Sequence, residues 1–168
     1  MKTIIAFLSL FVFLTSNAQV VLKENLTKKA NLYWDFNKTQ IQATGSYYKD
    51  EVDETTDKHG KWLYYDRLGV LEEERNYYKE MLHGKVVLYY SNKKLKQEGY
   101  FYLDRQDSVY REWFENGKLS VEGYYSSDKP VGKWTYYYMD GSKKSEEELI
   151  GDVNHLISFW SADSTHQQ

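Results

Sequence analysis

The chain has 168 residues, among them 17 Tyr, one Pro and no Cys, and its formal net charge is -3. An aromatic share of 17% excludes a typical disordered chain, because disordered segments are poor in aromatic residues. The lack of Cys excludes a disulfide scaffold and a thiolate metal site. The negative net charge argues against a nucleic-acid partner, since such proteins neutralise phosphates with Lys and Arg.

The first 18 residues have the pattern of a secretory signal peptide. Lys2 precedes an apolar run from Ile4 to Leu14, and small residues stand at the two positions that determine cleavage, Ser16 and Ala18. This run is too short to span a bilayer, which needs about 20 apolar residues. The sequence therefore predicts a signal peptide at residues 1–18, one domain at 19–168 and an exported protein. We expect this protein in the periplasm or outside the cell, without a membrane span.

The remainder of the chain is built from a repeat of 24 residues. The run Gly60-Lys61-Trp62-Leu63-Tyr64-Tyr65 recurs in phase at Gly84, Ser108 and Gly132. Other columns follow the same period: Leu71, Leu95 and Leu119; Glu74, Glu98, Glu122 and Glu146; Tyr77, Phe101 and Tyr125. A fixed period of this length is typical of repeat architectures.

Incomplete copies are expected at both ends. Trp34, Ile41, Thr44 and Tyr47 precede Tyr64, Leu71, Glu74 and Tyr77 by 30 residues, which predicts a loop insertion between Lys49 and Lys58. A last half-unit is expected around Ile157, Phe159 and Trp160. Terminal units of a repeat array are usually atypical because they cap it.

Each copy is predicted to be a β-hairpin. Asn116-Gly117 and Asp140-Gly141 are favoured in two-residue hairpin turns, and the flanking runs are rich in strand-forming Tyr, Trp and Val. The predicted fold is all-β: an elongated antiparallel meander of about ten strands in a single-layer or curled sheet.

Alternation along the strands predicts two unlike faces. A turn centred on Asn116-Gly117 pairs Phe114 with Leu119 and Trp113 with Ser120. We therefore expect a packing face that combines the following columns: Trp62, Val86, Tyr110 and Trp134; Tyr90, Phe114 and Tyr138; Leu71, Leu95 and Leu119; Tyr77, Phe101 and Tyr125. The other face should be wet and should carry the Glu column beside one aromatic column, Tyr65, Tyr89, Trp113 and Tyr137.

These columns resemble the bacterial variant of the MORN repeat found in YwqK-family antitoxin proteins. The resemblance rests on Gly60 to Tyr65, Asn116-Gly117, Glu122-Gly123 and Gly132 to Gly141, and it extends roughly from Trp34 to Leu149. It implies a β-meander with a role in binding or assembly rather than catalysis. The sequence departs from the pattern at three positions, where Ser108 replaces Gly, Val86 replaces Trp and Arg75 replaces Gly.

Three groups of residues have side chains that could carry site chemistry. His59 and His83 are 24 residues apart, so they should lie two strands or about 10 Å apart, too far to share one metal ion. The Glu column has a similar spacing, close to the outer limit for glycosidase acid pairs, but the repeat alone accounts for it. The acidic loop from Asp50 to Asp57 lacks the ligand spacing of an EF-hand. We predict no catalytic residue, no metal site and no cofactor.

The aromatic column Tyr65, Tyr89, Trp113 and Tyr137 is the predicted binding site. Aromatic side chains are enriched at protein interfaces, and their faces also stack on sugars or cations. The predicted function is a non-enzymatic, exported scaffold that binds another protein at the cell envelope. A glycan or cell-wall binding module and an immunity protein of a toxin–antitoxin pair remain as alternatives.

Overall fold

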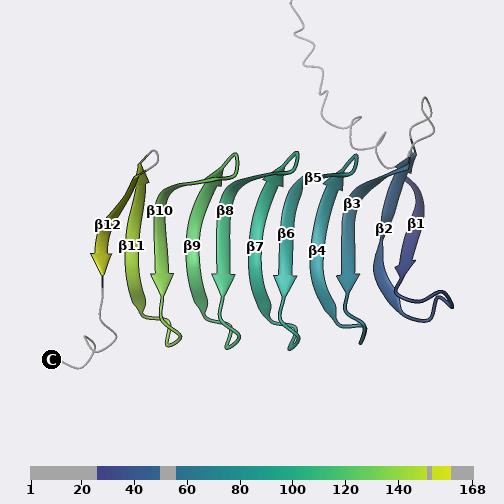
Figure 1. Cartoon of the computed structure of the whole chain (residues 1–168), viewed down its shortest axis with the longest axis horizontal. Coiled ribbons are helices and arrows are strands. Elements are labelled where there is room, and N and C mark those ends of the chain that lie inside the picture. Colours follow the sequence, from purple (N-terminus) through teal and green to yellow (C-terminus); the bar gives the residue numbers. More distant parts are fainter. Residues whose placement is uncertain (1–25, 50–55, 151–152, 160–168) are drawn as a thin grey trace, which may run out of the picture.

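The structure is a computed structural model, and it describes residues 26–49, 56–150 and 153–159. The described residues form one antiparallel sheet of twelve strands (Figure 1). The predicted signal peptide, Trp160 and most of the acidic loop lie outside the described residues. The prediction of an all-β meander is confirmed, although the expected number of about ten strands was too low.

The strands follow one another across the sheet in chain order, except that the short β5 pairs with β4 beside β6. Their bounds are β1 (Leu26–Tyr33), β2 (Ile41–Lys49), β3 (Thr56–Tyr65), β4 (Leu71–Tyr78), β5 (Met81–Leu82), β6 (Gly84–Tyr89), β7 (Leu95–Tyr102), β8 (Arg105–Trp113), β9 (Leu119–Ser126), β10 (Lys129–Tyr137), β11 (Lys143–Ile150) and β12 (Val153–Phe159). Figure 1 shows the sheet as a single open layer, with β1 and β12 at opposite ends.

The turns at one end of the strands are longer by one residue than the sequence predicted. The Phe114 N–H donates to Lys118 O, and the Gly117 N–H donates to Phe114 O, both at 2.8 Å. The loop is therefore Glu115-Asn116-Gly117, with Gly117 in the left-handed region at φ +91°. This is the three-residue hairpin, a type I turn followed by a left-handed residue, and it accepts the same Asn-Gly pair as the two-residue turn.

The longer turn is followed by a β-bulge, which changes the predicted register. Trp113 pairs with Leu119, whereas Glu112 pairs with Val121, so Ser120 is the extra residue. The predicted pairs of Phe114 with Leu119 and Trp113 with Ser120 are therefore wrong, while the pairs beyond the bulge are confirmed. The same shift recurs between β1 and β2, β3 and β4, β6 and β7, and β10 and β11.

The first hairpin also departs from the predicted alignment. Tyr33 pairs with Ile41 as Tyr65 pairs with Leu71, so Tyr33 and Tyr65 are equivalent. Trp34 therefore corresponds to Asp66 and not to Tyr64. The turn between β1 and β2 is two residues longer than its counterparts, because Tyr33 and Ile41 are separated by eight positions and Tyr65 and Leu71 by six.

At the opposite end, two-residue turns join consecutive units. Both residues of each turn have positive φ, which defines type I′ geometry: Lys79-Glu80, Leu103-Asp104 and Ser127-Asp128. The acidic second residue of each turn accepts a hydrogen bond at 2.7 Å from a backbone N–H 22 residues earlier: Glu80 from Lys58, Asp104 from Leu82 and Asp128 from Gln106. We call these contacts acidic clamps, and they tie the last turn of each unit to its first residue.

Close packing within the sheet comes from Trp rings that lie over Gly residues of the preceding strand. A Cβ atom on Gly45 would lie 2.1 Å from the Trp62 ring, and one on Gly123 would lie 2.3 Å from the Trp134 ring. Both indoles are buried. Glu74 pairs with Val87, and continuing this register places Arg75 opposite Val86. These two residues therefore occupy the positions that Gly123 and Trp134 occupy between β9 and β10. Two of the sequence departures are thus linked: where the Gly is replaced, the Trp is replaced too.

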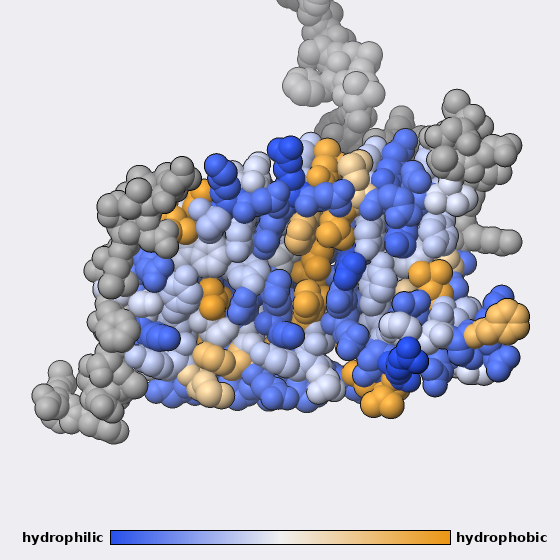
Figure 2. All heavy atoms as spheres, in the orientation of Figure 1, coloured by the Kyte–Doolittle hydropathy of each residue, from blue (hydrophilic) through white to orange (hydrophobic). Residues whose placement is uncertain are grey.

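Two aromatic clusters form the core on this face. Trp62, Ala43 and Tyr77 are buried together, and Tyr77 shares a hydrogen bond between hydroxyl groups with Tyr64 at 3.0 Å. Further along the sheet, the rings of Tyr110, Tyr125 and Trp134 contact one another with centroids 5.2 to 5.8 Å apart. Figure 2 shows that the surface in view is largely hydrophilic, with apolar atoms in a strip near β5 and β6.

Candidate functional site

The predicted aromatic column is half of a longer apolar row. Residues that pair directly across antiparallel strands point to the same face. Each aromatic residue of the column pairs with the residue that follows the next turn, so the row reads Tyr33-Ile41, Tyr65-Leu71, Tyr89-Leu95, Trp113-Leu119 and Tyr137-Lys143. We call this row, from Tyr33 to Leu119 with Tyr137, the apolar stripe.

The apolar stripe corrects the predicted position of the Leu column. Leu71, Leu95 and Leu119 were expected on the packing face with Trp62, but they lie on the face of the aromatic column. The physical reason is the bulge, because one extra residue shifts the alternation of the strand and reverses the side on which the following residues lie. The sequence signal for the shift was the Gly at the end of three of these turns, Gly69, Gly117 and Gly141, since a three-residue loop also favours Gly there; Lys93 takes the same place with φ +67°.

The apolar stripe is neither buried nor fully exposed. Ile41 and Leu95 are 40% and 38% exposed, and the four aromatic residues of the predicted site are half-buried. Neighbouring side chains along the row thus cover part of each other. Because the sheet has one layer, no described element lies over this face, and the remaining apolar area is accessible to a partner.

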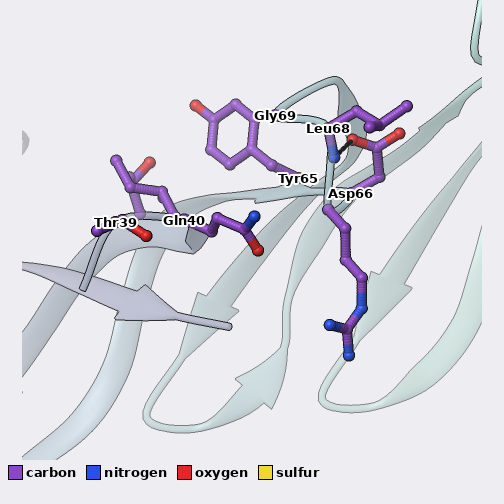
Figure 3. A pocket seen from close by; sticks show the side chains of 9 residues that line it. Thr39, Gln40, Tyr65, Asp66, Leu68 and Gly69 are labelled. Atoms are coloured by element: carbon purple, nitrogen blue, oxygen red, sulfur yellow. Dashed lines mark hydrogen bonds between the residues drawn. The ribbon is translucent and has the colours of Figure 1, made fainter. Parts of the chain in front are cut away.

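The ring of Tyr65 stands between two shallow hollows of the stripe. One hollow, of about 450 Å³, is lined by Ile41, Thr44, Tyr65 and the turn that follows it (Figure 3). The other, of about 520 Å³, lies between Tyr65 and Tyr89, with Leu71 in its lining. Both volumes lie within the range of small-molecule sites, although the hollows are open grooves.

The polar rim of the first hollow is held by local hydrogen bonds. The Asp66 carboxylate accepts the backbone N–H of Leu68 at 2.7 Å (Figure 3). It also accepts the backbone N–H of Val70 at 2.8 Å, and the two hydrogen bonds fix the turn. The Arg67 guanidinium lies 5.1 Å from the centroid of the Trp34 ring. The hollow therefore combines an apolar floor with an ordered polar rim.

The Glu column forms a second row on the same face, beside the apolar stripe. Glu98 is paired with Lys85 at 2.5 Å and with Arg111 at 3.1 Å, and Arg111 also contacts Glu122 at 2.6 Å. Glu146 is paired with Lys133 at 2.7 Å and Lys143 at 2.6 Å. We call this row of Glu74, Glu98, Glu122 and Glu146 with its cations the carboxylate row.

The carboxylate row corrects the prediction of a wet face. Glu98 and Glu146 are only 7% and 8% exposed. Burial raises the pKa of Glu98, but hydrogen bonds from Lys85 and Arg111 outweigh it, so that the pKa is lowered overall. Hydrogen bonds from Lys61 to Glu74, and from Lys133 and Lys143 to Glu146, likewise lower the pKa of each carboxyl.

These lowered pKa values bear on the glycosidase alternative. A general acid in that chemistry needs a raised pKa so that it stays protonated near neutral pH. Glu74, Glu98 and Glu146 are shifted in the opposite direction. The row is better described as a set of ion pairs across the two strands of each hairpin, with Arg111 joining neighbouring hairpins through Glu98.

One hydrogen bond connects the carboxylate row to the apolar stripe. The Tyr89 hydroxyl donates to Glu74 at 2.8 Å. Burial and this carboxylate raise the pKa of Tyr89 to about 12. The ring of Tyr89 is therefore held in a fixed orientation beside the hollow that it shares with Tyr65.

His59 and His83 are part of an aromatic ladder near the type I′ turns. The Tyr78 ring lies between them, 5.4 Å from His59 and 5.8 Å from His83 between centroids, and Tyr48 and Tyr102 extend the ladder at 5.7 and 5.2 Å. Burial, with a contribution from Lys79, lowers the pKa of His59. In the described part of the chain, no group of three His, Cys, Asp or Glu side chains is arranged to hold a metal ion.

Comparison with known proteins identifies the repeat. Three segments, 58–79, 82–103 and 106–127, match the family model of the MORN repeat variant. Each begins 24 residues after the one before it, as predicted, and each begins at the residue whose N–H is held by an acidic clamp. Three segments of the chain are thus similar to the MORN repeat variant, and the hairpins on either side continue the same topology.

MORN repeats are in general non-catalytic modules that bind proteins or membrane lipids. No curated protein matches the chain. Among the described residues, no helix has the length and apolar character to cross a membrane.

Proposed function

We propose that this protein is a non-enzymatic repeat scaffold that is exported to the cell envelope and binds another protein through the apolar stripe. The single observation that carries the proposal is the register, which joins the aromatic and Leu columns into one row across the sheet. The repeat family of binding modules supports it. The signal-peptide pattern at residues 1–18 supports export of the domain at 19–168.

The site fits a protein partner because it is long and continuous. Consecutive strands lie about 4.8 Å apart, so the row from Tyr33 to Tyr137 extends over several units. Protein interfaces are enriched in aromatic residues and have an apolar centre with a polar rim. Here the turns at one side and the carboxylate row at the other provide such a rim. Trp113 lies near the middle of the row, and its substitution should reduce the affinity for the partner more than substitution of any other residue of the stripe.

The test is capture of the partner from envelope extracts, followed by affinity measurement with the purified partner. We expect Trp113→Ala to weaken binding by about 30-fold, the effect of losing a typical hot-spot residue, while the circular dichroism spectrum stays unchanged. Tyr124→Ala is the control, because Tyr124 is 49% exposed and lies outside the stripe. Equal losses in both variants, or binding that is unchanged by Trp113→Ala, would contradict the proposal.

A glycan or cell-wall ligand is the second candidate, and the two hollows beside Tyr65 favour it. An aromatic ring with polar groups around it is suited to a sugar ring. This function predicts co-sedimentation with insoluble peptidoglycan or polysaccharide, competed by soluble sugar and reduced by Tyr65→Ala. Co-sedimentation that Tyr65→Ala leaves unchanged would speak against a site at these hollows.

The resemblance to YwqK-family antitoxin proteins carries a third candidate, an immunity protein. An exported immunity protein would act on an exported toxin. The export step on which this and the main proposal depend is tested by the N-terminal sequence of the protein recovered from cells. Cleavage should leave Gln19 as the first residue, and retention of Lys2 in a cytoplasmic protein would refute it.

A further inference from the structure

The strand β12 is one end of the sheet, and its outer edge has no partner among the described residues (Figure 1). It pairs with β11 from Ile150↔Val153 to Ser145↔Phe159, with a bulge after Leu156. An edge strand presents a row of unpaired N–H and C=O groups that can pair with another chain. The regular segment Val153–Leu156 therefore offers a template for one more strand.

The pairing identifies which backbone groups point outward. Ile150 and Val153 are separated by two positions, so they form the hydrogen-bonded pair that closes a two-residue hairpin. Hydrogen-bonded and non-hydrogen-bonded pairs alternate along an antiparallel ladder. Val153 and His155 thus direct their backbone groups toward β11, and Asn154 and Leu156 direct theirs away from the sheet.

The sequences of the two edge strands differ in how well they resist such pairing. Natural sheets protect their edges with Lys, Pro, bulges or inward-pointing charges. β1 contains Lys28 and Lys29 and has two irregularities in its register. β12 reads Val-Asn-His-Leu-Ile-Ser-Phe, without Lys, Arg, Asp, Glu, Pro or Gly.

We propose that two copies of this protein pair through β12, antiparallel strand to antiparallel strand, and form one continuous sheet. The segment contains no Lys, Arg, Asp or Glu, so two copies can pair without charge repulsion, whereas each β1 strand carries two Lys residues in its sequence. An interface that pairs the same strand in both copies closes with two-fold symmetry. The dimer would present its two apolar stripes on the same face of the sheet, at opposite ends of the paired strands.

The experiment measures the molar mass of the protein, in the form that cells produce, by light scattering over about 10 μM to 1 mM, the range of weak association. We expect the mass to rise from one chain to two and to stop there. Asn154→Pro removes an outward N–H and should hold the mass at one chain with an unchanged circular dichroism spectrum, because Pro is tolerated on edge strands. Leu156→Pro tests the second outward N–H in the same way.

His155→Pro is the matched control, since it removes an N–H that bonds to β11 and should destabilise the last hairpin. Three results would overturn the proposal: a single-chain mass at every concentration, growth beyond two chains, which would indicate pairing of β12 with β1 of another copy, and a dimer that survives both Asn154→Pro and Leu156→Pro. A fourth result would also overturn the proposal: the full chain stays monomeric, but the chain without residues 160–168 forms a dimer. This would identify residues 160–168 of the same chain as the occupant of the β12 edge.

Discussion

At the scale of single residues, packing is decided at the repeat position occupied by Gly45, Gly99 and Gly123. The rings of Trp62 and Trp134 occupy the space that a Cβ atom on Gly45 and Gly123 would need. Gly99 lies opposite the smaller ring of Tyr110. The sequence shows the Gly column, but a column alone does not say whether its members serve a turn, a bulge or a close approach. Here the reason is close approach, since none of the three has positive φ.

Gly123→Ala should lower the free energy of unfolding by about 1–3 kcal/mol, the usual cost of overpacking, because the new Cβ would meet the Trp134 ring at 2.3 Å. Gly99→Ala is the control from the same column, where the nearest atom is the flexible end of Gln106 at 3.2 Å. Urea unfolding of both variants measures the difference. A similar cost in both would show that backbone entropy, and not the indole, decides.

The sequence also suggests how the effect of Gly123→Ala can be removed. In the repeat that contains Arg75 and Val86, a large residue stands at the Gly position, and the facing Trp position holds the smaller Val. In a double-mutant cycle, Gly123→Ala should therefore cost much less in a Trp134→Val background, with a coupling of about 0.5–3 kcal/mol. Additive effects would mean that the two positions do not share the same space.

At the scale of the structural element, each unit is a hairpin closed by an acidic clamp. The clamps at Glu80, Asp104 and Asp128 join residues that are 22 positions apart, so they hold the last turn of a unit against its first strand. The sequence predicted the hairpins from Tyr, Trp and Val content but missed these turns, because Lys-Glu, Leu-Asp and Ser-Asp are weak turn signals. Their positive φ values follow from the strands that they connect.

Asp104→Gly isolates the contribution of a clamp. Gly retains the positive φ of the turn without strain but cannot accept the Leu82 N–H. We expect a loss of about 1 kcal/mol in the free energy of unfolding, the usual net value of a hydrogen bond. Asp104→Asn keeps an acceptor and tolerates the same backbone conformation, so it should lose less. Equal stability of the Gly variant and the wild type would show that the clamp contributes nothing.

At the scale of the whole molecule, a single layer has to stabilise itself without a second sheet. Stability in such an array is a sum of hairpin terms and contacts between neighbours. The carboxylate row supplies contacts of this second kind, because Arg111 connects β7 with β9 through Glu98 and Glu122. The stability of the sheet should for this reason depend on pH.

The carboxyls of Glu74, Glu98 and Glu146 have lowered pKa values in the folded protein. Their contribution is fully present above the unfolded value of about 4.3 and is lost as the pH falls through the lowered values. The urea midpoint should therefore decrease between about pH 5 and pH 3. Glu98→Gln should flatten this decrease, whereas Glu115→Gln, at an exposed turn, should not. A midpoint that is constant over this range would contradict the assignment.

The amino-acid sequence by itself determined the all-β class, the 24-residue period and the hairpin as the unit, because spacing and strand propensity are local properties. It also determined the aromatic column, since Tyr65, Tyr89, Trp113 and Tyr137 share one position of the period. The tertiary structure decided which residues accompany that column. A bulge of one residue after each turn moved Leu71, Leu95 and Leu119 to the same face, and Asn-Gly does not reveal whether the loop has two residues or three. Burial of Glu98 and Glu146 was likewise decided only by the tertiary structure, because strand pairing brings Lys85 and Arg111 to Glu98 and Lys133 to Glu146, and that register is not a local property of the sequence.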